Sequence, residues 1–328
     1  MPQSRRSCCP IRRNLLAMLV MGGVVGIAQI NFDPMCVGAS PQDRGVPFAP
    51  PMMDLPPVVP APELKQTSNQ NEVSSDPQEL EPASDPHILR GIWALKMASH
   101  TIATGVKGFE NVSNYTATMF KQERVGGLLS EGQSIELKLR HEPFSVYMKW
   151  LTGDSGRQLI YVDGLNDGNL LVQPGGIRGR LTGVLSLDPT GSMAMSESRH
   201  PVTKIGILGL AKTILSYQKK DLERAEGFRC ELHDNQKFND RDCYLFNCEY
   251  DSEEANPDYR KSTMFIDKEL GMPVCVKNFC WGRDVNPETI DEETLVEFYA
   301  YDDIQFEREL TAADFDQNNR SYRLRVRR

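Results

Sequence analysis

Three consecutive segments between residues 112 and 163 alternate polar and apolar residues almost without exception. In the segment 134–140 every second residue is aliphatic, and in 144–150 the apolar residues again fall on alternate positions. Because successive side chains of a strand point to opposite faces, this period of two predicts an antiparallel meander of strands joined by short turns. The pattern therefore predicts a sheet with one apolar face and one face that tolerates water.

The apolar face of these strands has two interpretations. A curved sheet that a helix covers only in part leaves room for an acyl chain or another apolar ligand. A sheet that is fully covered forms an ordinary core instead. The candidate ligand wall, under the first interpretation, consists of Ile135, Leu137, Leu139, Val146, Met148 and Trp150.

The first 85 residues hold two segments that are not typical of a folded domain. Basic residues between 5 and 13 precede an apolar run at 15–28, and small residues at 37–39 suit a signal peptidase, so a secretory signal peptide is predicted at 1–39. An uncleaved membrane anchor is the alternative. Residues 40–85 are rich in proline and polar residues and predict a disordered linker. We therefore expect a folded domain at 86–328 in a periplasmic or other extracytoplasmic location.

From Asp85 onward the sequence predicts one domain of mixed helix and strand. Asp85 and Pro86 are typical of a helix start, and the apolar spacing that follows predicts a helix with Gly105 as its stop. A second helix is expected between residues 201 and 226, after an irregular region at 175–200. Further strands are expected near 159–163, 170–173, 229–232, 243–249, 262–267, 274–281 and 294–301.

Charge and cysteine usage exclude some classes of partner. The net charge is −8, which argues against nucleic-acid binding. The arginine-rich end, 320–328, alternates with apolar residues and predicts an amphipathic final strand, with contact to anionic lipid headgroups as the alternative.

The cysteine spacing places close neighbours on opposite faces of a strand, so any disulfide would join different strands. No CxxC spacing occurs, so we expect no metal site, and no cofactor motif is present.

Candidate catalytic motifs are weak. Ser155 lies in a Gly-Asp-Ser-Gly sequence that looks like the nucleophile motif of serine proteases, but the matching histidine signature is missing upstream. A hairpin turn explains the same residues better. His200 and Glu197 could do acid–base work only if the fold brought them together. We therefore predict that the protein is not an enzyme.

The order of elements resembles the periplasmic lipoprotein-carrier and lipoprotein-sorting proteins with the LolA-like fold, over most of residues 88–326. A helix leads into Val112–Glu123, which looks like that family's first strand, and Glu131–Gln133 opens the second. Later, Phe265–Asp267 with Leu270–Pro273 resembles the family's strand-turn-strand, and Leu310–Phe315 resembles its closing segment. The insert at 175–200 looks closer to an uncharacterised branch of secreted bacterial proteins than to the carrier itself.

The resemblance implies an α+β fold, in which helices pack on the concave face of an open antiparallel half-barrel sheet, with a cavity for lipid chains. In the carrier, an arginine beside a proline after the second strand helps to hold the lid closed. Arg140 is the matching residue here, although His141 and Glu142 separate it from Pro143. A solvated residue at a strand end is the alternative interpretation of Arg140. Met193 and Met195 are further lid candidates, because thioethers repack around varied ligands, with ordinary loop packing as the alternative.

Two functions remain. The first is a non-catalytic envelope protein that binds a lipid, a lipoprotein acyl chain or another apolar ligand in the half-barrel cavity. Its expected partners are lipids or acylated proteins, with membrane contact. The alternative is an interaction or sensor module of the same fold, with a filled core and an envelope protein as its partner.

Overall fold

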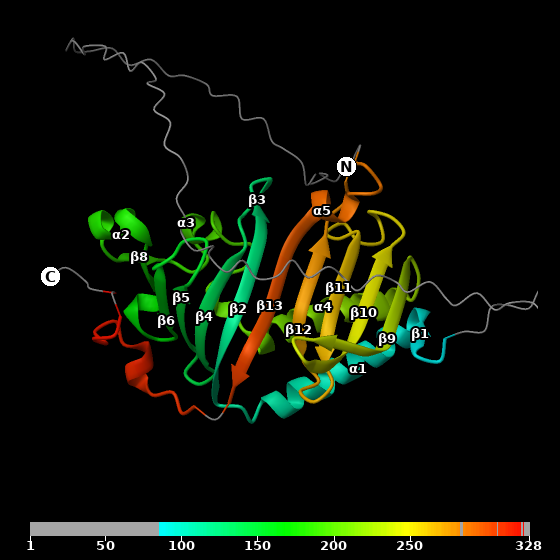
Figure 1. Ribbon diagram of the computed structural model, residues 1–328, viewed down its shortest axis with the longest axis horizontal. Helices are drawn as coiled ribbons and strands as arrows, with labels where there is room; N and C mark the ends of the chain where they lie inside the picture. The colour runs from blue at the N-terminus through cyan, green and yellow to red at the C-terminus, as the bar shows by residue number, and fades with distance from the viewer. Residues whose placement is uncertain (1–84, 283–284, 307, 323, 325–328) are drawn as a thin grey trace, which may run out of the picture. The chain divides into compact units, whose positions relative to one another are not determined.

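One continuous antiparallel sheet organises the domain (Figure 1). The computed structural model describes residues 85–282, 285–306, 308–322 and 324, all within one compact unit. The sheet has 13 strands in the order β1-β9-β10-β11-β12-β13-β2-β4-β5-β6-β7-β8, with β3 paired to β2 outside this path. The predicted signal peptide, and the predicted linker except for its last residue, lie outside the described residues.

The strands of the sheet run as follows: β1 Ile88–Arg90, β2 Asn114–Val125, β3 Leu128–Leu129, β4 Gln133–Arg140, β5 Ser145–Trp150, β6 Gln158–Val162, β7 Leu170–Gln173, β8 Leu185–Leu187, β9 Phe228–Phe238, β10 Arg241–Tyr250, β11 Lys261–Asp267, β12 Pro273–Phe279 and β13 Leu295–Gln305. The α-helices are α1 Gly91–Phe109, α2 Gly176–Thr182, α3 Ser192–Met195, α4 Ile207–Arg224 and α5 Ile290–Thr294. Short 3₁₀ turns lie at Asn166–Gly168, Val202–Lys204 and Ala312–Phe315.

The alternating segments form strands in the register that buries their apolar residues together. Leu137 of β4 lies opposite Met148 of β5, and Leu139 lies opposite Val146. These side chains point to the face that α1 and α4 cover, which we call the inner face. The α+β fold class and the open antiparallel sheet predicted from the sequence are therefore confirmed.

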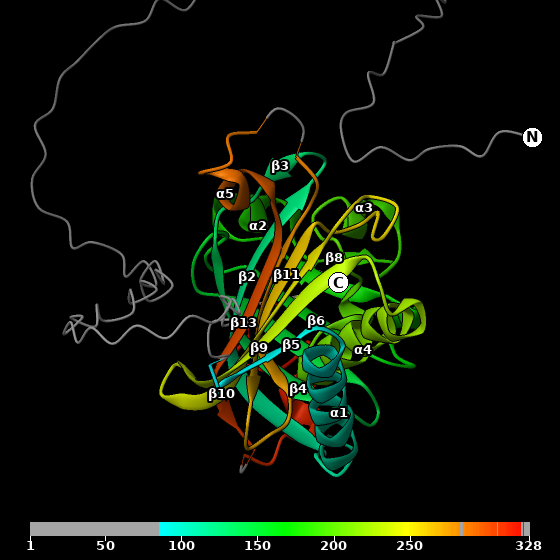
Figure 2. The ribbon, with the colours of Figure 1, turned by 90° about the vertical axis from the view of Figure 1, so that its right-hand side faces the viewer.

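Two helices cover the inner face (Figure 2). Leu95 and Ile102 of α1 and Ile207 and Ala211 of α4 share one buried core with the strands. The backbone N–H of Ile207 donates to the hydroxyl oxygen of Tyr115 of β2 at 2.9 Å, which fixes the start of α4 against the sheet. None of the helices in the described part of the chain is long and apolar enough to cross a membrane.

The predicted limits of the first helix are wrong. Residues Ile88–Arg90 form β1 and pair with β9, so the helix begins at Gly91. It also continues past Gly105 to Phe109. Gly105 is needed for packing, because a Cβ there would lie 2.2 Å from the carbonyl oxygen of Gly271.

The region 175–200 contains two short helices, α2 and α3, and strand β8, where the sequence predicted irregular structure. The predicted final strand is also corrected over the residues that can be described. Tyr322 and Leu324 are buried as the alternation requires, but neither lies in a strand. They pack against the sheet through their side chains alone.

The outer face of the sheet is partly covered by the C-terminal segment, defined here as residues 310–322 and 324. Its apolar side chains form a second cluster with those on the outer face of β5 and β6: Tyr147, Ile160, Val162, Leu310, Phe315, Tyr322 and Leu324. Lys138 of β4 lies beneath this segment and donates to Asp314 Oδ1 at 2.9 Å and to Tyr322 Oη at 3.1 Å. The polar residues on the outer face of β4 are therefore not all exposed to water.

Candidate functional site

A cavity of about 670 Å³ lies between the inner face of the sheet, helix α4 and the segment 185–206. This volume falls within the range of about 300–1,000 Å³ that is usual for small-molecule sites. One wall is apolar, and its residues come from strands β2, β5, β6 and β7: Met119, Met148, Trp150, Leu159, Leu170 and Val172. Leu210 and Ile214 of α4 face this wall. The cavity is thus the gap that an incompletely covered sheet leaves.

The structure separates the predicted site residues into three groups. Met148 and Trp150 line the cavity. The other four residues of the predicted wall are almost completely buried in the core and do not line it: Ile135, Leu137, Leu139 and Val146. They lie on the same inner face of the sheet, beside the cavity wall.

The two predicted lid methionines line the cavity from α3, and Met193 is 61% exposed at its edge. Arg140 lies elsewhere. Its guanidinium lies 5.0 Å from the centre of the Phe315 ring, and its Nη2 donates to Ser145 Oγ at 2.9 Å. Arg140 therefore contacts the C-terminal segment on the outer face and does not line the cavity.

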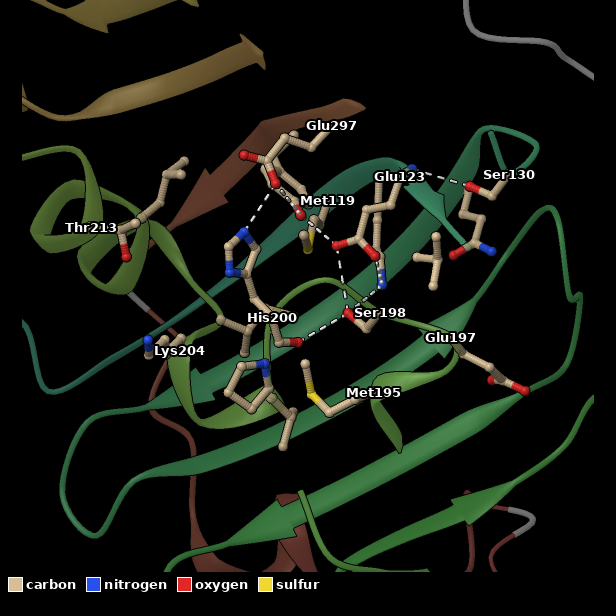
Figure 3. A pocket seen from close by; sticks show the side chains of 18 of the residues that line it. Met119, Glu123, Ser130, Met195, Glu197, Ser198, His200, Lys204, Thr213 and Glu297 are labelled. Carbon is tan, nitrogen blue, oxygen red and sulfur yellow. Dashed lines mark hydrogen bonds and ion pairs between the residues drawn. The ribbon is translucent and has the colours of Figure 1, made fainter. Parts of the chain in front are cut away.

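The other end of the cavity is polar, and the sequence analysis missed it. Glu123 of β2 and Glu297 of β13 lie opposite each other in register, and each is only 2% exposed. Both line the cavity (Figure 3). Glu123 follows the same alternation as Met119, so its position on the inner face could have been read from the sequence. The burial of Glu123 could not be read from the sequence.

Glu123 is bound from three directions. Lys121 Nζ lies 3.1 Å from Glu123 Oε2, and the backbone nitrogen of Arg199 donates to the same oxygen at 3.0 Å. The hydroxyl of Tyr299 donates to Oε1. Lys121 Nζ also donates to Ser198 Oγ at 3.0 Å. Each oxygen of this carboxylate therefore has a partner.

Glu297 has still more partners. Arg199 Nε lies 3.1 Å from its Oε2, and His200 Nε2 lies 3.0 Å from the same atom. Tyr259 Oη and Asn278 Nδ2 donate to Oε1 at 2.7 and 2.8 Å. The segment Ser198–His200 is thus held on both buried carboxylates, and it closes one side of the cavity (Figure 3).

These contacts decide the charge of Glu297. Burial alone would raise its pKa, but the hydrogen bonds from His200 and Asn278 and the positive charge of Arg199 outweigh burial and lower the pKa to about 2. Burial beside the carboxylates raises the pKa of Tyr259 and of Tyr299. Glu297 is therefore a charged acceptor at neutral pH, and the two phenols remain neutral donors.

Ser198 and His200 do not form a nucleophile–base pair. Ser198 Oγ donates to the backbone oxygen of His200 at 3.0 Å and is not bonded to its ring. Glu197, the residue that sequence proximity paired with His200, instead binds Arg157 Nη1 at 2.6 Å. The segment 151–157 that contains Ser155 connects β5 to β6 as a turn. Among the described residues, no group of three or more His, Cys, Asp or Glu side chains could hold a metal ion.

A buried amide in the cavity wall lacks a hydrogen-bond partner on its nitrogen within the part of the chain that the structure describes. Gln218 of α4 is 4% exposed and lines the cavity. Its Oε1 accepts from Ser99 Oγ at 2.8 Å, while its Nε2 finds no hydrogen-bond partner among the described residues. A buried amide that lacks a partner costs about 1–3 kcal/mol, so a polar group of a bound molecule would be stabilised there.

Residues 112–324 match the family model described as "Protein of unknown function (DUF1571)". The chain belongs to this family. No curated protein matches the chain.

Several solved structures are similar to the chain at low sequence identity. The Mycobacterium tuberculosis lipoprotein LppX is 11% identical with a TM-score of 0.38, over 66% of this chain and 99% of that one. A DUF1329 family protein from Desulfovibrio piger is 10% identical with a TM-score of 0.32, over 68% and 97%. A LolA superfamily protein from Nitrosomonas europaea is 11% identical with a TM-score of 0.20, over 67% and 97%. The LolA-like family that the sequence resembles is thus found among these matches.

Proposed function

We propose that the protein is a non-catalytic envelope protein that binds an amphipathic ligand, such as a lipid or the acyl chain of a lipoprotein, in the cavity on the inner face of its sheet. The observation that carries the proposal is the cavity itself, which combines an apolar wall with one polar end. A filled core, which the alternative of a sensor module requires, does not fit a volume of about 670 Å³.

The apolar wall supports binding of a chain. Met148, Leu159 and Val172 offer side chains without polar atoms other than the thioether, and each CH₂ group removed from water contributes roughly 0.8 kcal/mol. Met193 and Met195 at the edge can repack around chains of different length. The wall therefore selects for an extended apolar group and not for one chemical structure.

The polar end supports a ligand group that carries no net charge. The two carboxylates, Glu123 and Glu297, are matched by Lys121 and Arg199. A bare anion or cation placed between these groups would disturb this balance, and burial of an unpaired charge is costly. We propose that a neutral or zwitterionic polar group lies at this end.

A cavity-filling substitution tests the proposal. Ala194 of α3 lines the cavity, so Ala194→Trp should remove room for several CH₂ groups; the loss of two would cost roughly 1.6 kcal/mol, or more than tenfold in Kd. Ala313 is exposed on the C-terminal segment, and Ala313→Trp is the matched control.

The assay is displacement of a fluorescent, zwitterionic phosphatidylcholine from the purified chain by unlabelled phospholipids. We expect Ala313→Trp to bind as the wild type does and Ala194→Trp to bind at least tenfold more weakly, with both variants folded by circular dichroism. Phosphatidylethanolamine should displace the probe better than phosphatidylglycerol. Equal binding by the two variants would refute ligand binding in this cavity.

A further inference from the structure

Two buried cysteines face each other across neighbouring strands. Cys230 of β9 and Cys248 of β10 lie directly opposite in register. Each is 2% exposed, and their Sγ atoms are 2.9 Å apart. This separation is shorter than two unbonded thiols need for comfortable packing, so a small shift of side chains alone would bring them to bonding distance.

The backbone geometry of this pair suits a covalent bond. The backbone nitrogen of Asp251 donates to Gly227 O at 3.0 Å, which makes these two residues a hydrogen-bonded pair of the ladder. Pairs alternate along an antiparallel ladder, so the Cys248–Cys230 pair, three residues further on, is a non-hydrogen-bonded pair. The Cα atoms of such pairs are about 4.5 Å apart, inside the range of about 4.4–6.8 Å that a disulfide spans.

The neighbouring cysteines do not share this geometry. Cys243 lies opposite Gln236 and Asp267 in its two ladders. Cys275 lies opposite Phe265 and Ala300. Neither residue therefore has a cysteine across from it in a neighbouring strand, and Cys230 and Cys248 are the pair that the register selects.

We propose that Cys230 and Cys248 form a disulfide bond when the chain folds in an oxidising compartment. A disulfide-bearing oxidant accepts the electrons. The thiolate of one cysteine attacks it, forms a mixed disulfide and releases one thiol; the second thiolate then displaces the other thiol. Two protons and two electrons leave the cysteine pair, and the oxidant's disulfide becomes two thiols.

The bond would act on a wall of the cavity. Cys248 lines the cavity, and helix α1 packs on β9, one of the two strands that the bond joins. A cross-link there would keep β9 and β10 in register at this wall of the cavity. The inference rests on the proposed extracytoplasmic location but does not depend on the identity of the ligand.

The test is a peptide map of the full chain after refolding with glutathione disulfide. Free thiols are alkylated in denaturant, and trypsin then releases the peptide 230–237, with Cys230, and the peptide 242–260, with Cys243 and Cys248. We expect these peptides to be linked in the wild type and in Cys243→Ala, and to be separate in Cys248→Ala. The unreduced protein should also unfold up to roughly 10 °C above the reduced one.

Full alkylation of Cys230 and Cys248 in the refolded wild type would overturn the proposal. A link between the two peptides that survives in Cys248→Ala would also overturn it, because Cys243 would then be the partner of Cys230. The peptide map of the wild type alone decides between a bond and two thiols, even if a variant does not fold.

Discussion

The buried carboxylate Glu297 should make the stability of this protein depend on pH in a defined way. Its pKa is lowered from the ordinary value of 4.5 to about 2 by its hydrogen bonds and by Arg199. That difference corresponds to about 3 kcal/mol of stabilisation at neutral pH. Because the folded-state pKa is the lower one, this stabilisation is complete above pH 4.5 and is lost as the pH falls toward 2.

The perturbation is Glu297→Gln, which keeps the shape of the side chain and removes its charge. We expect the free energy of unfolding to fall by about 3 kcal/mol at pH 7, and the difference from the wild type to shrink to about 1.5 kcal/mol at pH 3. Urea unfolding followed by circular dichroism at both pH values measures the two differences.

Glu136→Gln is the matched control. Glu136 is on the outer face, where its exposed carboxylate lies 3.5 Å from Lys149 Nζ. An exposed pair of this kind contributes less than about 1 kcal/mol, so the control should change stability little. A difference between Glu297→Gln and the wild type that is the same at pH 7 and pH 3 would refute the reasoning, as would one below 1 kcal/mol at pH 7.

Two further predictions concern packing. Gly105→Ala should lower the free energy of unfolding by about 1–3 kcal/mol, because the added Cβ has no room. Gly108→Ala, whose Cβ would meet nothing within 4 Å, should raise the free energy of unfolding by about 0.5–1 kcal/mol. Urea unfolding of the two variants measures both changes, and equal effects would contradict the close contact at Gly105. Lys138→Met removes the ion pair to Asp314 and should lower the free energy of unfolding by about 1–3 kcal/mol. It should also speed proteolysis of the C-terminal segment. Lys149→Met, at an exposed pair, is the control; equal proteolysis of the two would contradict this role.

The strands could be predicted from sequence because their signal is local. The alternation in 134–150 alone places Leu137 and Met148 on one face, and the structure has both there. The start of α1 could not be predicted in the same way. Asp85 and Pro86 match a helix start, but residues 88–90 pair with β9, which lies more than 130 residues away in sequence. A long-range ladder thus overrides a local signal.

The apolar half of the candidate site was predictable and the polar half was not. Met148 and Trp150 stand out because alternation marks them as inner-face residues. Glu123 satisfies the same alternation, but a single carboxylate near a strand end is typical of a solvated residue. Its burial depends on Tyr299, whose hydroxyl it accepts from, and on the segment Ser198–His200, which the fold brings over it. Only the tertiary structure supplies those partners.

Native mass spectrometry with lipid extraction, on the full chain purified from a bacterial envelope without harsh detergent, tests the central claim most directly. The proposal predicts a bound acyl-chain species at one copy per chain, which Ala194→Trp reduces and Ala313→Trp retains. A mass without ligand, unchanged after incubation with phospholipids and acylated peptides, would contradict it.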